Sequence, residues 1–323
     1  LLQPVCLRVY LSIVLCLLFG WRSHPNNKHK TIIFRGRRMK PILVFQTDFT
    51  YKESAVSAMY GVVKSVDREL EIIDATHEIP QYDIWSASYR LFQPINFWPE
   101  GTIFVSVVDP GVGTARRGCV ARTSNGYYVV TPDNGSLTHL KAWVGIDAVR
   151  EIDQSVNRLR GKNTEGSSVF HGRDVFAYTA ARLASGIITY EGVGPAYPVE
   201  EIITFPIHEP VDEPGRVRGM FEIGDPNFGN LWTNIPLEVL QSAGFAYGDQ
   251  PRLVVRRDGR VVFDQRVPFH PSFGYAPKGE VMIYNNELMR VSVAINQGSL
   301  MERYNLSYGP EWEVEISRDA ADE

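Results

Sequence analysis

The chain has 323 residues, of which 44% are hydrophobic, 11% aromatic and 22% charged, and this composition excludes disordered, collagen-like and low-complexity proteins. The length is sufficient for about two domains with cores of their own. Residues 1–38 hold seven of the 33 Lys and Arg residues and none of the 37 Asp and Glu residues. The rest of the chain therefore has 26 basic and 37 acidic residues, a net charge of −11. This acidity argues against nucleic-acid binding, which needs a basic surface.

An apolar run of thirteen residues, Val9–Trp21, lies within the first 38 residues and is followed by six basic side chains. A membrane span needs about twenty residues, and the run is not followed by the small-residue cleavage site of a signal peptide. Met39 directly precedes a buried-strand pattern, so we favour Met39 as the true start and expect residues 1–38 to lie outside the fold. The alternative is a short membrane anchor with its basic flank in the cytoplasm.

From Met39 to residue 205, strand-like apolar runs alternate with apolar residues at helical spacing. Strands are predicted at 42–46, 71–74, 102–108, 119–123 and 127–131, the last two flanking the hairpin signal Ser-Asn-Gly. Helices are predicted at 54–67, 84–92 and 175–183. This alternation predicts an α/β domain at 39–205, with a mostly parallel sheet flanked by helices.

The pattern changes near residue 205. Residues 206–215 contain three prolines without periodicity and are predicted to form a linker. Short alternating segments follow at 216–223, 252–256, 260–265, 280–284, 290–295 and 311–316. These segments predict a C-terminal all-β domain at 216–318, similar to a small barrel.

The cysteines indicate the compartment. Three cysteines cannot form a disulfide framework, and two of them, Cys6 and Cys16, lie in the N-terminal segment. Cys119 is therefore alone in the body, which suits a reducing compartment and predicts a cytoplasmic protein. Because the Cys and His residues lack zinc-ligand spacing, we expect no metal site.

Four polar or glycine-rich clusters follow predicted strands or precede a predicted helix, where parallel sheets bind their ligands. They are Gln46–Thr50, Val108–Arg117, Thr131–Gly135 and Phe170–Asp174. Taken singly, each is compatible with a helix cap, a tight turn, a buried histidine or a local ion pair. Phosphate binding is weakly supported, because the second cluster lacks the third glycine of a dinucleotide loop and the chain lacks Gly-Lys-Ser/Thr. Together, the clusters predict one site.

The clusters also form a recognisable set of motifs in chain order. The motifs are Thr47-Asp-Phe49, Val108-Asp-Pro-Gly-Val-Gly-Thr-x-Arg116, Pro132-Asp-Asn-Gly135, Phe170-His-Gly-Arg-Asp174, Phe228-Gly-Asn230, Thr233-Asn-Ile235 and Asn296-Gln-Gly298. The set covers about residues 39–310 and resembles the S-adenosyl-L-methionine hydroxide adenosyltransferase family, which is homologous to the bacterial fluorinase and chlorinase.

The resemblance implies an activity and an assembly. The implied reaction is attack of water, as hydroxide, on the ribose 5′ carbon of S-adenosyl-L-methionine, giving adenosine and methionine. The implied assembly is a homotrimer whose sites lie between the α/β domain of one subunit and the β domain of its neighbour. S-adenosyl-L-methionine is the substrate, so no cofactor is implied, and neither a nucleic acid nor a membrane is expected as a partner.

Motif matching carries the family's functional residues onto this chain. The implied catalytic residues are Asp109, Arg116 and His171. The implied substrate-binding residues are Asp48, Glu53, Tyr82, Asn134, Asp225, Phe228 and Asn230. Of these, Asp48 would bind the ribose, Tyr82 would lie near the ribose and Glu53 would bind the methionine amino group.

The implied catalytic residues suit this chemistry. A sulfonium is a good leaving group, so the difficult step is the activation of water. Asp109 can accept a hydrogen bond from water, His171 can act as a base or orient the water, and Arg116 stabilises a neighbouring anion. Asp48 can accept hydrogen bonds from both hydroxyls of a ribose.

Three positions bear on specificity. Glu53 replaces the family's usual Asp, and Leu288 replaces the arginine with which the halogenases hold the methionine carboxylate. These departures leave open a second hypothesis, a non-catalytic sensor that binds adenosine or S-adenosyl-L-methionine. Asp109 stands where the halogenases carry Tyr, and its carboxylate argues against halogenation because it would repel a halide.

Overall fold

The computed structural model describes residues 39–161, 164 and 166–318. The predicted upstream or anchor-like segment 1–38 lies outside these residues. The described chain from Lys40 onward belongs to one compact unit. Within the described ranges, no helix combines the length and apolar character needed to cross a membrane.

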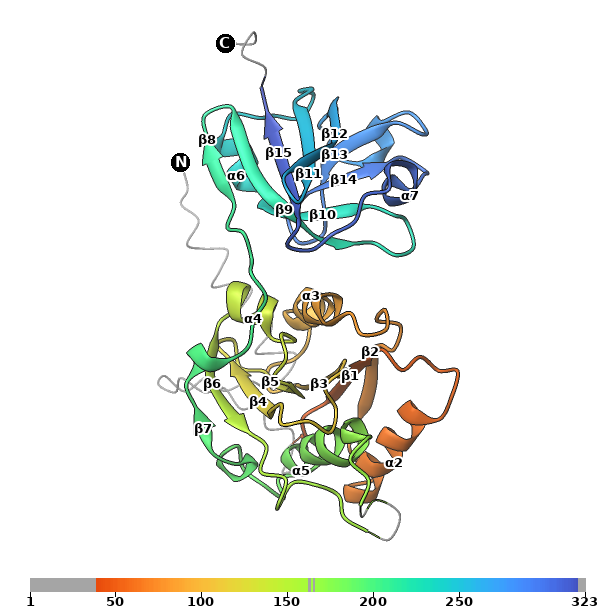
Figure 1. Ribbon diagram of the computed structural model, residues 1–323, viewed down its shortest axis with the longest axis vertical. Helices are drawn as coiled ribbons and strands as arrows, with labels where there is room; N and C mark the ends of the chain where they lie inside the picture. Colours follow the sequence, from red (N-terminus) through yellow and green to blue (C-terminus); the bar gives the residue numbers. More distant parts are fainter. Residues whose placement is uncertain (1–38, 162–163, 165, 319–323) are drawn as a thin grey trace, which may run out of the picture. The chain divides into compact units, whose positions relative to one another are not determined.

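The N-terminal half forms a mixed sheet of seven strands (Figure 1). Its strands are β1 (Leu43–Thr47), β2 (Ile72–Thr76), β3 (Ile103–Val107), β4 (Gly118–Thr123), β5 (Tyr128–Pro132), β6 (Ile146–Glu151) and β7 (Ala196–Tyr197). In the order β2-β1-β3-β5-β4-β6-β7, the first four strands pair in parallel and the remaining strands join antiparallel. The predicted α/β class is confirmed, and β4 and β5 form the predicted hairpin.

Helices cover both faces of this sheet, with α3 and α4 on one face and α2 and α5 on the other (Figure 1). They are α2 (Ala55–Val66), α3 (Ile84–Ile95), α4 (Thr138–Trp143) and α5 (Tyr178–Ala184), the last preceded by a π-helical segment, η1 (Gly172–Ala177). Two short 3₁₀ turns, η2 (Glu191–Val193) and η3 (Val199–Glu201), flank β7. Asp83 caps α3, because its side chain accepts a hydrogen bond from the Ser86 N–H at 2.9 Å.

The α/β half has a core on each face of the sheet. Phe45 and Val105 pack with Phe176 on the face of α2 and α5. Tyr89 and Phe104 belong to the core on the face of α3 and α4. A sheet that is buried on both faces explains why β1 and β3 consist of buried residues throughout.

The C-terminal half forms an antiparallel half-barrel sheet, which agrees with the predicted all-β, barrel-like class. Its strands are β8 (Val211–Glu213), β9 (Arg216–Gly224), β10 (Leu231–Pro236), β11 (Arg252–Arg257), β12 (Arg260–Arg266), β13 (Val281–Asn285), β14 (Arg290–Ile295) and β15 (Trp312–Ser317). Three short helical segments complete it, α6 (Leu237–Ser242), η4 (Phe273–Tyr275) and α7 (Leu300–Tyr304). Asp258 and Gly259, with φ of 49° and 75°, make the tight turn between β11 and β12.

Buried polar contacts join the two halves of the compact unit. Glu222 on β9 is fully buried, pairs with Arg290 on β14 and accepts a hydrogen bond from Trp143 Nε1 of α4 at 2.8 Å. Trp85 Nε1 of α3 donates to the Glu222 carbonyl at 2.6 Å. Burial raises the pKa of the Glu222 carboxyl, an effect that the Arg290 guanidinium opposes.

Candidate active site

The predicted polar clusters do meet at the carboxyl ends of the parallel strands. Asp48 directly follows β1, Asp109 follows β3 by two residues and Asn134 follows β5 by two. Because these strands are parallel neighbours, their carboxyl ends lie at one edge of the sheet, the usual place for a ligand in α/β folds.

Arg116 joins two predicted catalytic side chains. Its Nε donates to Asp109 Oδ1 at 2.8 Å, and its Nη2 contacts both Asp109 Oδ2 and His171 Nδ1, the latter at 3.0 Å. The Asp109 and Arg116 side chains are only 6% and 9% exposed, and His171 is buried. The guanidinium also lies over the Phe176 ring, 5.1 Å from its centroid. The three predicted catalytic residues therefore form one contiguous cluster.

The glycine-rich loop after β3 makes this pairing possible. The Val112 N–H donates to the Asp109 carbonyl at 3.2 Å and the Thr114 N–H to the Gly111 carbonyl at 3.2 Å, so the chain turns tightly. Gly113 has φ 79° and lies so close to the Ser168 carbonyl that a β carbon would approach it to 3.1 Å. The turn brings Arg116 back over Asp109.

The contacts of His171 fix its protonation pattern. A guanidinium can only donate, so Nδ1 accepts from Arg116 and a neutral imidazole carries its proton on Nε2. Burial, followed by the nearby Arg116 and Arg158 charges, lowers the pKa of His171 below its ordinary 6.5, despite the opposing Asp109 and Asp174 carboxylates. His171 is therefore a neutral hydrogen-bond donor through Nε2 at neutral pH.

Two buried polar atoms of the cluster have no hydrogen-bond partner, namely His171 Nε2 and Arg116 Nη1. Buried N–H groups without partners are costly in a folded protein, since they lose their hydrogen bonds to water. Their presence beside a carboxylate indicates a place where a small polar molecule, such as water, is bound.

Asp48 and Tyr82 also lie together. The Tyr82 N–H donates to Asp48 Oδ2 at 3.0 Å, and the Tyr82 side chain is exposed. Burial raises the pKa of Asp48, the Tyr82 N–H lowers it, and the charge of Asp109 raises it again. The contribution of Asp109 indicates that two carboxylates face the same region, an arrangement suited to a cationic ligand.

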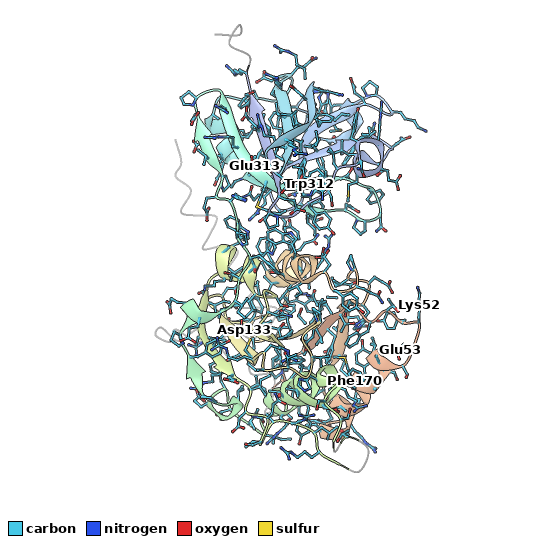
Figure 2. All side chains as sticks on the ribbon, in the orientation of Figure 1. Lys52, Glu53, Asp133, Phe170, Trp312 and Glu313 are labelled. Atoms are coloured by element: carbon cyan, nitrogen blue, oxygen red, sulfur yellow. The ribbon has the colours of Figure 1, made fainter. Side chains whose placement is uncertain are left out.

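Glu53 and Asn134 are engaged by their own loops. Glu53 Oε1 accepts from the Ala55 N–H at 3.0 Å, at the turn into α2 where Figure 2 labels it. Asn134 Nδ2 donates to the Val108 carbonyl at 3.0 Å, and its Oδ1 accepts from the Ser136 hydroxyl at 2.7 Å. Asn134 thus fixes the loop after β5 to the end of β3. Ligand binding by either residue stays a prediction.

A second predicted group lies in the C-terminal half. Asp225, Phe228 and Asn230 line a pocket of about 970 Å³, whose lining residues all lie between positions 225 and 302. Asp225 Oδ1 accepts from the Asn227 and Phe228 N–H groups at 2.9 and 3.2 Å, which shapes the loop and leaves the Phe228 ring exposed. The structure therefore collects the predicted residues into two groups, one in each half.

Sequence reasoning assigned no role to several residues near the first group. Phe49 and Phe170 meet edge to face, with ring centroids 5.9 Å apart, and thereby join the loop after β1 to the segment before His171. His77 follows β2 and is buried beside Thr47. Its position directly after a strand was the available signal. In the described part of the chain, no cluster of three or more His, Cys, Asp and Glu residues could hold a metal ion.

Two family models match the chain. The SAM hydroxide adenosyltransferase N-terminal domain matches residues 43–194, and the corresponding C-terminal domain matches residues 222–313.

Curated relatives match over most of their length. An (R)-S-adenosyl-L-methionine hydrolase of Thermus thermophilus is 34% identical over 276 residues, covering 84% of this chain and 98% of the relative. A fluorinase of Actinopolyspora mzabensis is 28% identical over 295 residues, covering 84% of this chain and 95% of the relative. The crystal structure of an uncharacterized conserved protein from Thermotoga maritima superposes with a TM-score of 0.75 and 32% identity, over 86% of this chain and all of that one. The chain therefore belongs to the SAM hydroxide adenosyltransferase family.

Proposed function

We propose that this protein hydrolyses S-adenosyl-L-methionine to adenosine and L-methionine. The observation that carries the proposal is the buried cluster in which Arg116 joins Asp109 and His171, with the His171 Nε2 proton unpartnered. The family and its named hydrolases support the choice of substrate.

The reaction forms one bond and breaks one. The oxygen of water attacks the ribose 5′ carbon, and the electron pair of the C5′–S bond goes to sulfur, which becomes the neutral thioether of methionine. Water loses one proton, which reaches solvent through the groups of the site. Positive charge leaves sulfur during the attack, so a poorly solvating site favours the transition state over the separated charges.

Each member of the cluster has a distinct proposed role. Asp109 accepts a hydrogen bond from the attacking water and draws negative charge onto its oxygen. His171 donates from Nε2 and orients that oxygen, because its Nδ1 is already occupied by Arg116. Arg116 is the bridge that fixes both side chains before substrate binds, which lowers the entropic cost of reaching the reactive geometry.

The substrate-binding residues divide along the molecule of S-adenosyl-L-methionine. Asp48 accepts hydrogen bonds from the ribose hydroxyls, and Tyr82 packs on the sugar. Glu53 binds the methionine ammonium group. Asn134 holds the loop beside the reacting carbon.

The remaining three binding residues come from the C-terminal pocket, where Phe228 stacks on adenine while Asp225 and Asn230 give polar contacts to the adenosyl group. Leu288 cannot hold the methionine carboxylate, so the main recognition falls on the adenosyl part and the ammonium.

We also propose that the two groups complete one site between copies of the chain in a homotrimer. Two domains, 39–205 and 216–318 joined by the linker 206–215, would then each contribute one wall. The support is that all residues lining the C-terminal pocket lie between positions 225 and 302, outside the half that carries Asp109. Coexpressing Asp109→Asn, which impairs the reaction, with Asn230→Ala, which impairs binding at low substrate concentration, tests this arrangement. At low substrate concentration, mixed trimers regain activity if the sites are shared, and stay impaired if each site lies within one chain.

A cytoplasmic location completes the proposal. It is supported by Cys119, which is buried and unpaired, as expected in a reducing compartment. Cell fractionation with an antibody against the protein tests it, and recovery in the membrane fraction would contradict it.

The test of the function is incubation with S-adenosyl-L-methionine in ¹⁸O-labelled water. Adenosine and methionine should appear in equal amounts, with the label in the adenosine 5′ hydroxyl. Label elsewhere would contradict attack on the 5′ carbon, and a halogenated product in added chloride would contradict hydrolysis. Tight binding of the substrate without any product would favour the sensor hypothesis instead.

A further inference from the structure

The loop after β1 (residues 48–53) and the loop after β2 (residues 77–83), here the β1 loop and the β2 loop, are tied together by their backbones. The Thr50 N–H donates to the His77 carbonyl at 2.8 Å. The Ile79 N–H donates to the Thr47 carbonyl at 3.3 Å. The β1 loop carries Asp48 and the β2 loop carries Tyr82, so whatever fixes one loop to the other also fixes the proposed ribose ligands.

The His77 side chain is the buried link between these loops. Only 1% of His77 is exposed. Its Nδ1 lies 2.8 Å from Thr47 Oγ1, while its Nε2 lies 2.9 Å from the Tyr60 hydroxyl and 3.2 Å from Asp74 Oδ1. Both ring nitrogens are therefore engaged, one toward each loop-bearing strand.

The hydrogen bonds of this network have a definite direction. The Asp74 carboxylate can only accept, so in a neutral imidazole His77 Nε2 carries the proton and donates toward Asp74. His77 Nδ1 then accepts from the Thr47 hydroxyl, whose oxygen also accepts from the Phe49 N–H at 3.1 Å. The hydroxyls of Tyr51 and Tyr60 donate to the same carboxylate, which ends the chain of donors.

The order Thr47, His77, Asp74 has the residue types of a nucleophilic triad, but its burial excludes that role. Thr47 is fully buried, so its hydroxyl cannot meet a substrate. Its oxygen is also engaged by the N–H of the β1 loop. The network therefore acts on the residues that flank it, the first of which is Asp48.

We infer that His77 is a positioning residue, which holds Asp48 and Tyr82 in place for the ribose of the adenosyl substrate. The inference rests on the proposed function. Asp48 follows Thr47 directly, and its Oδ2 accepts from the Tyr82 N–H at 3.0 Å. Tyr82 has φ 66°, a conformation that costs free energy and persists only where its surroundings hold it.

Three variants separate the two sides of the imidazole. The amide of Asn ends at the position of Nδ1, so His77→Asn keeps an acceptor for Thr47. The amide of Gln reaches the position of Nε2, so His77→Gln keeps the Asp74 side and loses Thr47. Thr47→Val removes the hydroxyl at nearly constant volume. His208→Gln, a change at a histidine in the predicted linker whose Nε2 contacts the Pro310 carbonyl, is the matched control.

The expected readout is a change in KM rather than in kcat. For His77→Gln and Thr47→Val, KM for S-adenosyl-L-methionine and Kd for adenosine should rise about tenfold, because each variant loses one hydrogen bond that holds the ribose ligands in place. His77→Asn should stay close to the unmodified protein, as should His208→Gln. The value of kcat should change little in every variant, because Asp109, Arg116 and His171 lie on other segments.

A double-mutant cycle excludes a merely structural role. In an Asp48→Asn background, His77→Gln should add little to KM or to the adenosine Kd, because the ligand that it positions is already weakened. A contribution that adds in full would contradict the inference, as would an unchanged KM in folded His77→Gln or a loss confined to kcat. Circular dichroism and Tm identify variants that do not fold, and Thr47→Val, which removes the same contact with His77, then carries the comparison.

The two proposals fail in different ways. If the unmodified protein binds adenosine by calorimetry but releases none from S-adenosyl-L-methionine, the hydrolase proposal falls, and the adenosine Kd of the variants still tests His77. If hydrolysis occurs and the variants keep their KM and Kd, His77 is not a positioning residue. If the unmodified protein neither binds adenosine nor releases it from S-adenosyl-L-methionine, both proposals fall.

Discussion

The two groups of predicted site residues, one in each half of the compact unit, differ in how far they are buried. The cluster of Asp109, Arg116 and His171 is buried and already assembled through hydrogen bonds. The C-terminal pocket is broad and presents the Phe228 ring at 68% exposure. We infer that the cluster in the α/β half is organised in advance for the reaction, whereas the C-terminal pocket serves recognition together with Asp48, Glu53 and Tyr82. Chemistry and binding should therefore respond to different substitutions.

The largest expected effect is on the chemical step. Asp109→Asn keeps the size of the side chain but removes the charge, and should lower kcat about 10³-fold, within the range of a lost acid–base group. The adenosine Kd should change little. Product release measured by chromatography and Kd by calorimetry check this, with the exposed Asp212→Asn as the control. Equal losses in kcat and binding would mean that the α/β half does not separate the two tasks.

The next effect tests whether the halves are one energetic unit. Arg290→Met leaves the Glu222 carboxylate buried without its partner, and should lower the free energy of unfolding by about 3 kcal/mol. The double variant Glu222→Gln/Arg290→Met should recover part of this loss. Calorimetry should show one transition moving to lower temperature. Two transitions, of which only one moves, would show that the halves unfold independently.

A smaller effect is expected in the C-terminal pocket. Phe228→Ala removes the ring that we propose to stack on adenine, and should raise KM about tenfold, since base stacking on an aromatic ring contributes about 1–3 kcal/mol. The value of kcat should be nearly unchanged. Tyr275→Ala removes an exposed ring that does not line the pocket and should have no effect. A fall in kcat for Phe228→Ala would show that the C-terminal pocket contributes to the chemical step as well as to binding.

The smallest expected effect is the fall of kcat/KM at acidic pH that protonation of His171 causes. Because its pKa is lowered, the value of kcat/KM should stay flat from neutral pH down to 6.5 and fall only below it, as His171 gains a proton and Nδ1 can no longer accept from Arg116. The unfolded chain takes up this proton first, so the free energy of unfolding should fall in the same window. A decline of kcat/KM that begins above pH 6.5 would show that a group other than His171 causes it.

The sequence predicted well where the polar groups of the α/β half gather, because strand ends carry a local signal. Asp48 and Asp109 directly follow apolar runs, and the structure brings them to one edge of the sheet. The Gly-rich turn that returns Arg116 to Asp109 is also short enough to recognise from its residues. Asp258 and Gly259, which form the turn between β11 and β12, are likewise residues typical of such a turn.

Long-range order was harder to predict. β10 was missed because Thr233 and Asn234 interrupt its apolar pattern, although both are buried and bonded to other strands. β6 and β7 were not predicted as strands, because three of the six residues of β6 are charged and β7 is only two residues long. His77 was overlooked because its main partner, Thr47, lies 30 positions away. Such pairings depend on strand order, which periodicity does not encode.

The π-helical turn behind His171 has a consequence for ancestry. In the segment Gly172–Ala177 the backbone bonds reach one residue further than in an α-helix, so the segment accommodates a single extra residue. Deleting one position there would let the helix tighten and would turn the imidazole by about 100° around the axis, away from Arg116. A one-residue insertion into an ordinary helix therefore accounts for this turn, and a chain without the extra residue would not hold the imidazole against Arg116.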